Sequence, residues 1–307
     1  MTQRKIILIV VCALLACDCI IQGILANISP VKTIKTDLSP DTITIQSAAE
    51  TTVLTAGANG WSINTDNYLA TKSDVDAMLK ALKEVKVLDK VGKIGNADYD
   101  ARYNLTDEKA KTVTATKDGK QIAALRIGKA SSTGSQTYAT VNGAKDIVLV
   151  SGNLTSTFGK SAVELRAKTV YSIEENAVAA AQITMGAKTW GLQNTAKAGD
   201  KAVWALTGNV PAIELDQDAA QSWIRNVCFL NVNSWLDDSA ALPPNKLTSF
   251  TLTTTSGETV FVDIYEKKAG DDTQYIGTCS RTPHKFDLTK YLTEKFTKDY
   301  EELKVKA

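Results

Sequence analysis

The stretch TVTATKDGKQIAALRI, residues 112–127, decides the fold of this 307-residue chain. Apolar and polar residues alternate on both sides of Asp118-Gly119, as they do in a strand that buries one face. An Asp-Gly pair favours the two-residue turn that joins antiparallel strands, because these residues tolerate positive φ angles. The same pattern follows at residues 136–150, around Asn142-Gly143. The sequence therefore predicts consecutive β-hairpins in an antiparallel sheet.

Upstream of these hairpins, the sequence predicts further strands and one helix. Alternation marks short strands at residues 42–46, 51–55 and 60–64. Within residues 72–90 the apolar residues fall at helical spacing: Val75, Met78, Leu79, Leu82 and Val85. Ser73 is placed to cap the first turn. We therefore expect an amphipathic helix of about four turns that packs on the sheet.

The second half of the sequence repeats this order. Trp204-Ala-Leu matches Trp61-Ser-Ile, and Ser256-Gly257 between alternating runs matches the turn at Asp118-Gly119. A second amphipathic helix is predicted within residues 218–236, with the apolar residues Ala220, Trp223, Ile224, Val227 and Cys228. Repetition at a nearly constant offset is the signature of a duplicated unit.

The predicted fold class is therefore α+β, a duplicated unit in which each copy is a mainly antiparallel β-sheet with one principal amphipathic helix. The first copy is expected over residues 41–173 and the second over residues 174–307. A chain of this length buries enough surface to fold without metal ions or disulfides. The equivalent positions of Trp61 and Trp204 favour core packing over a ligand groove.

A long apolar run occupies the N-terminus. Arg4 and Lys5 precede residues 6–17, and apolar residues resume after Asp18 up to Ala26. This length is about enough for one helix to span a bilayer, and the basic pair predicts that the rest of the chain lies outside the cytoplasm. We predict a single transmembrane helix over residues 1–27, an uncleaved signal anchor in the inner membrane of a bacterium, followed by a stalk linker over residues 28–40.

Two other interpretations of this segment stay open. Leu14-Leu15-Ala16-Cys17 is similar to a relaxed lipoprotein box, in which Cys17 would be lipidated. Ordinary cleavage near Ala26 is the other alternative. The anchor is favoured because the apolar run continues after Cys17, and all three interpretations export the remaining residues.

Charge and cysteine usage exclude other classes of protein. The chain has 35 basic and 34 acidic residues, and no basic cluster interleaved with aromatic residues occurs, so we exclude nucleic-acid binding. Outside the membrane segment only Cys228 and Cys279 remain. They are a candidate disulfide in an exported domain, whereas a buried thiol is the alternative for Cys228 on an apolar helix face.

The sequence contains few residues that could form a catalytic or metal-binding site. His284 is the only histidine, which excludes a multi-histidine metal site. Gly128–Gly134 lacks the residue order of a phosphate-binding loop and is expected to be a hairpin loop. Asp216 and Asp218 fit a helix cap better than a calcium loop. We therefore predict no catalytic, cofactor-binding or metal-binding residues.

Several short motifs carry a family resemblance. They are Gly60-Trp61-Ser62-Ile63, Tyr103-Asn104-Leu105, Leu125-Arg126-Ile127-Gly128, Tyr138-Ala139-Thr140-Val141 and Leu165-Arg166. This pattern resembles the family catalogued as domain of unknown function 4340. The resemblance implies one N-terminal membrane anchor, an extracytoplasmic domain and a neighbourhood of ABC-type transport components, including those related to gliding motility. It assigns no catalytic residue.

The expected function is that of a membrane-anchored accessory or interaction module without catalytic activity. The expected partners are an ABC-type permease and ATPase, or other envelope proteins. The alternative is an extracytoplasmic binding protein for a small molecule or glycan, which would use a cleft between the two copies. A third hypothesis is a hydrolase whose catalytic residues meet only in the fold.

Overall fold

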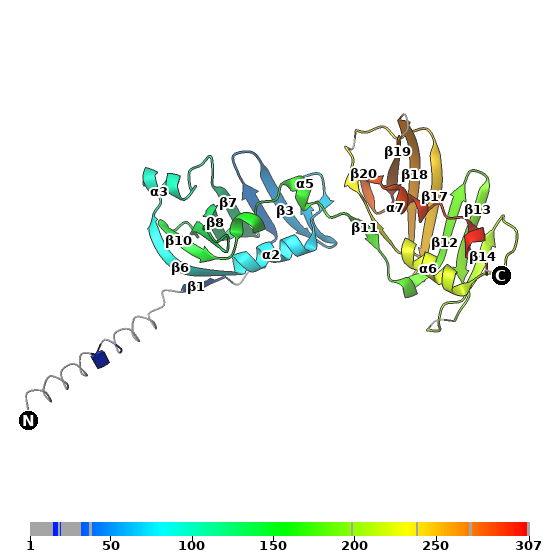
Figure 1. Ribbon diagram of the computed structural model, residues 1–307, viewed down its shortest axis with the longest axis horizontal. Helices are drawn as coiled ribbons and strands as arrows, with labels where there is room; N and C mark the ends of the chain where they lie inside the picture. The colour runs from blue at the N-terminus through cyan, green and yellow to red at the C-terminus, as the bar shows by residue number, and fades with distance from the viewer. Residues whose placement is uncertain are drawn as a thin grey trace, which may run out of the picture. The chain divides into compact units, whose positions relative to one another are not determined.

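The computed structural model describes residues 15–17, 19, 32–36, 39–197, 199–237, 239–269 and 272–305. The chain divides into two units, which meet in the sequence between Ala167 and Lys168 (Figure 1). Both units consist mostly of antiparallel β-sheet with a few helices, which confirms the predicted α+β class.

The described part of the first unit contains a ten-stranded sheet. Its order is β1-β6-β10-β9-β8-β7-β2-β3-β4-β5, and the paired strands are antiparallel. The strands are β1 (Lys32–Lys35), β2 (Thr42–Gln46), β3 (Thr51–Gly57), β4 (Gly60–Ile63), β5 (Tyr68–Leu69), β6 (Glu84–Lys93), β7 (Lys111–Lys117), β8 (Lys120–Ala130), β9 (Gln136–Val141) and β10 (Asp146–Ser151). The helices are α2 (Lys72–Lys83), α3 (Ala97–Arg102), α4 (Leu154–Thr157) and α5 (Ala162–Leu165).

The predicted hairpins are confirmed. β7 and β8 meet at Asp118-Gly119, and β9 and β10 are joined by residues 142–145, which begin with Asn142-Gly143. The φ angles are 49° and 73° in the first turn and 49° and 72° in the second. Positive φ at both central residues is the geometry of the turn that matches strand twist.

The first principal helix is shorter than predicted. α2 packs against the sheet through Val75, Met78 and Leu82, but it ends at Lys83 (Figure 1). Val85, assigned above to the helix, lies in β6, where it and Val87 are the buried residues of an alternating run. β-branched valines at every second position favour a strand. Thr71, and not Ser73, occupies the N-cap position, without a side-chain capping bond.

The first strand also differs from expectation. Lys32–Lys35 lies inside the segment expected to be a stalk, yet it forms β1 and pairs with Glu84–Val87. β1 supplies hydrogen-bond partners for the main chain of residues 84–87, which the prediction had placed in the helix. The edge strand carries a lysine at each end, and charged side chains discourage further strand pairing.

The described part of the second unit contains an eight-stranded and a two-stranded sheet. The orders are β14-β13-β12-β17-β18-β19-β20-β16 and β11-β15. The strands are β11 (Thr169–Ser172), β12 (Val178–Met185), β13 (Lys188–Asn194), β14 (Trp204–Gly208), β15 (Phe229–Asn231), β16 (Ser234–Trp235), β17 (Lys246–Thr254), β18 (Thr259–Ala269), β19 (Asp272–Cys279) and β20 (Thr282–Leu288). The helices are η1 (Glu175–Ala177), α6 (Gln217–Val227), α7 (Lys290–Glu294) and η2 (Tyr300–Leu303).

The second principal helix begins as predicted and ends early. The Asp216 carboxylate accepts hydrogen bonds from the amides of Asp218 and Ala219, so Asp216 caps the helix. α6 ends at Val227, where the chain turns into β15 instead of continuing as helix. Its buried face consists of Ala220, Trp223, Ile224 and Val227.

Eight strands of the ten-stranded sheet follow the same order as the eight-stranded sheet. From β4 the first sheet runs β4-β3-β2-β7-β8-β9-β10-β6, and from β14 the second runs β14-β13-β12-β17-β18-β19-β20-β16. In both units the principal helix follows the third of these strands in the chain. β1 pairs with the start of β6, just as β11 pairs with β15 directly after α6.

The central strands of each large sheet bury one face. In β2, β7 and β17 every second residue is buried, and the residues between are half-buried or exposed and, apart from Leu247, polar. We call these opposite surfaces the open faces. Neighbouring residues of the first are Thr42, Thr44, Thr114 and Thr116, and of the second Ser249, Thr251, Phe261 and Asp263.

Among the described residues, no helix is long and apolar enough to cross a membrane. Of the predicted transmembrane segment, residues 1–27, the structure describes only Leu15–Cys17 and Cys19, all in helical conformation. The prediction for the rest of that segment lies outside the described residues.

Candidate functional site

The family-like motifs meet in the first unit, where they support packing. The Arg126 guanidinium donates to the Leu105 carbonyl from Nε at 3.1 Å and from Nη2 at 2.9 Å. The same Nη2 lies 2.6 Å from Oδ1 of Asp107. The Lys129 amide donates to the Tyr103 carbonyl at 2.9 Å. These bonds fasten the segment after α3 to β8.

At two motif positions the local backbone favours the residue type that is present. Asn104 has a φ of 56°, a conformation that asparagine tolerates better than most residues. A Cβ on Gly128 would lie 2.1 Å from the Tyr103 carbonyl oxygen, so only glycine fits there without a shift of the backbone. Tyr103 also packs on Tyr138, with ring centroids 4.4 Å apart.

The Leu165-Arg166 motif closes the first unit. The Thr71 amide donates to the Leu165 carbonyl at 2.8 Å. The Arg166 guanidinium carbon lies 3.7 Å from the centroid of the Tyr68 ring, a cation–π contact. The motif residues that the sequence singled out therefore hold the fold together, which spacing alone did not reveal.

A depression in the second unit is the candidate site. It has a volume of about 580 Å³ and lies between α6 and the segment formed by α7 and η2. We call it the α6 groove. Its α6 side is formed by Ala219, Ser222, Trp223 and Asn226, and its other side includes Tyr291, Lys295, Lys298 and Glu302. The volume falls within the range of about 300–1,000 Å³ typical of ligand sites.

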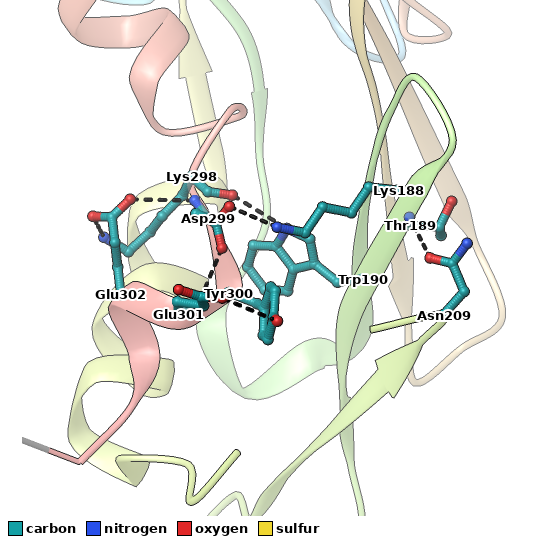
Figure 2. Close-up of polar contacts among 9 residues, drawn as sticks. All are labelled: Lys188, Thr189, Trp190, Asn209, Lys298, Asp299, Tyr300, Glu301 and Glu302. Carbon is teal, nitrogen blue, oxygen red and sulfur yellow. Dashed lines mark hydrogen bonds and ion pairs between the residues drawn. The ribbon is translucent and has the colours of Figure 1, made fainter. Parts of the chain in front are cut away.

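A polar cluster holds the far wall of the α6 groove (Figure 2). Nζ of Lys188 on β13 lies 2.7 Å from Oδ2 of Asp299, and the Trp190 indole donates to the Lys298 carbonyl at 3.2 Å. Lys298 pairs with Glu302 at 2.8 Å. The hydrogen bond between Lys188 and Asp299 raises the pKa of the lysine and lowers the pKa of the carboxyl group.

Lys295 is the distinctive residue of the α6 groove. Its ammonium lies 5.0 Å from the ring centroid of Phe229 and 5.2 Å from that of Tyr291. These rings are 41% and 70% exposed. Burial lowers the pKa of Lys295, and none of the ion pairs between described residues includes it. The sequence signal for this contact is the four-residue spacing of Tyr291 and Lys295, which the sequence predictions did not include.

Three of the other sequence candidates, His284, Cys228 and Cys279, are buried. His284 is buried in β20. Its ring lies edge-on to the Trp235 ring, with the ring centroids 6.0 Å apart. Cys228 and Cys279 are buried thiols, and burial raises the pKa of Cys228 to about 11 and also raises that of Cys279. Cys17 is exposed. Within the described ranges, no group of three or more His, Cys, Asp and Glu side chains could hold a metal ion.

Three tryptophans are buried in the second core. They are Trp190, Trp204 and Trp223, whereas Trp61 in the first unit is half-buried. The Trp204 indole donates to the Gln221 side chain at 2.7 Å, and the Trp223 indole donates to the Lys295 carbonyl at 2.9 Å. Packing is therefore the main role of these rings, and only Trp223 also borders the α6 groove.

Fold and site together define a protein of two mainly antiparallel α+β units. Comparison with protein families matches residues 61–254 to the Domain of unknown function (DUF4340), and the chain belongs to this family. The match covers the motif cluster and α6, and it ends before α7 and η2. No curated protein and no solved structure matches the chain.

Proposed function

We propose that this protein is a membrane-anchored, extracytoplasmic accessory module without catalytic activity. In this proposal, residues 1–27 anchor it in a bacterial inner membrane, with lipidation at Cys17 as the alternative. Its partners are an ABC-type permease and ATPase, or another envelope complex. The observation that supports it best is the open face of the central strands of each sheet, a largely polar surface that lies opposite the buried core.

The second open face has the composition of a protein contact surface. Phe261 is 55% exposed and pairs across the strands with Thr251. Next to it, Lys246 forms an ion pair with Asp263 at 2.8 Å. An exposed aromatic side chain surrounded by polar groups is typical of the centre and rim of protein interfaces.

We infer in addition that the two units arose by duplication. The shared strand order, with β1 and β11 as matching first strands, supports this inference. In this inference, the open faces of the two units are related to each other. Two weak contacts on one chain bind more tightly than either contact alone when both can engage.

Crosslinking in intact cells tests the proposal. The tagged full-length protein is crosslinked, solubilised and purified, and the retained proteins are identified by mass spectrometry. We expect an ABC-type permease and ATPase, with much lower recovery for Phe261→Asp. Val203→Asp is the matched control, because Val203 is also exposed and lies outside the open face. Recovery of the bait alone would contradict the proposal.

A further inference from the structure

Lys295 takes part in no ion pair between described residues, although Glu294 and Glu302 also line the α6 groove. The other groove lysine, Lys298, pairs with Glu302 at 2.8 Å. Lys295 instead has two aromatic neighbours, Phe229 and Tyr291, which contribute less than a carboxylate would. A partly desolvated ammonium gains from any anion that reaches it.

Hydrogen-bonding groups are available beside this ammonium. Ser222 and Asn226 are exposed on α6 and line the same groove as Lys295. No hydrogen bond between described residues engages either side chain. The two residues are four positions apart on the helix, about 6.0 Å along the axis. Main-chain groups on one side of an extended peptide repeat every two residues, about 6.6 Å, which is a comparable spacing.

We propose that the α6 groove binds an acidic peptide segment of a partner protein, with a carboxylate on Lys295 and main-chain groups on Ser222 and Asn226. This inference rests on the proposed function, because it assigns part of the partner contact. Tyr291, which lines the groove and is 70% exposed, would contact apolar parts of the peptide. A peptide is favoured over a sugar because the aromatic rings already contact Lys295 and are less available for stacking.

The test measures binding of a labelled hexaglutamate peptide to the purified full-length protein in detergent, by fluorescence anisotropy. We expect hexaglutamate to bind at least tenfold more tightly than hexaglutamine. Lys295→Met should weaken hexaglutamate binding at least tenfold, and Lys295→Arg should retain it. Lys290→Met is the matched control, since Lys290 is an exposed lysine at the start of α7 that does not line the groove. Thermal melting of each variant verifies that it is folded.

Equal binding of hexaglutamate by wild type, Lys295→Met and Lys290→Met would overturn the inference. Tighter binding of an oligogalacturonate than of hexaglutamate would also overturn it, in favour of a glycan site. The two proposals fail separately. If the crosslinking recovers a permease but wild type and both variants bind the peptide equally, only the groove assignment is refuted. Peptide binding that depends on Lys295 supports the groove assignment, whatever proteins the crosslinking recovers.

Discussion

Lys188 and Asp299 lie 111 residues apart in the sequence, and their side chains form an ion pair of 2.7 Å. The pair joins the start of β13 to the segment before η2 (Figure 2). The Lys188 ammonium also lies 4.5 Å from the centroid of the Tyr300 ring. Through these contacts the core sheet of the second unit fixes one wall of the α6 groove.

The first prediction concerns the pH dependence of this pair. The hydrogen bond from Lys188 lowers the pKa of Asp299, so its contribution to stability is complete above the unfolded aspartate pKa of about 3.9. The contribution is lost as the pH falls through the lower, folded pKa. A double-mutant cycle of Lys188→Met and Asp299→Asn, measured by urea unfolding, should give favourable coupling at pH 7 that disappears in acid. Coupling that is absent at pH 7 would contradict this prediction.

The second prediction concerns Trp190, which is fully buried and donates to the Lys298 carbonyl. Trp190→Phe removes the donor to this part-buried carbonyl, and loss of the hydrogen bond costs about 0.5–1.5 kcal/mol. Hydrogen exchange should show faster opening of residues 298–303 and no change in the first unit. Unchanged hydrogen exchange of residues 298–303 would mean that the Trp190 hydrogen bond does not stabilise this wall of the α6 groove.

The third prediction concerns Gly128. A Cβ at this position would meet the Tyr103 carbonyl oxygen at 2.1 Å, so Gly128→Ala should lower the free energy of unfolding by about 1–3 kcal/mol. Gly57→Ala is the control, because its Cβ would come no closer than 3.3 Å to the Gly60 carbonyl oxygen. Chemical denaturation of both variants measures the difference, and equal losses would refute the steric argument.

The fourth prediction concerns the two buried cysteines. Because burial raises the pKa of Cys228 to about 11, its thiol stays protonated and unreactive at neutral pH. Maleimide should label Cys228 and Cys279 slowly in the folded protein, and fully after unfolding without reductant. Peptide mass spectrometry distinguishes them from the N-terminal cysteines. A Cys228–Cys279 disulfide peptide from non-reduced protein would contradict the thiol state.

The sequence predicted those elements that local patterns determine. The turns at Asp118-Gly119 and Asn142-Gly143, and the Asp216 cap, depend on a few adjacent residues and were correct. The boundary between α2 and β6 was missed because Val85 fits both a helical face and an alternating strand. β1 was missed because a short edge strand is stabilised by its partner, which local composition does not reveal.

The candidate site was less accessible to sequence reasoning. The motifs were noticed as a family resemblance, but the clash that requires Gly128 appears only when Tyr103 is placed beside it. The α6 groove combines residues from α6 and from the last two helices, which are far apart in the chain. Such tertiary proximity leaves no periodic pattern in the sequence.

Site-specific photo-crosslinking tests the central claim, an interaction module, most directly. A photoreactive amino acid replaces Thr251 on the second open face, and Lys80 on the exposed side of α2 serves as the control. The full-length protein is irradiated in living cells, and the adducts are identified by mass spectrometry. We expect position 251 to crosslink to a subunit of one membrane complex and position 80 to give no such adduct. Adducts at neither position, or equal adducts at both, would contradict the claim.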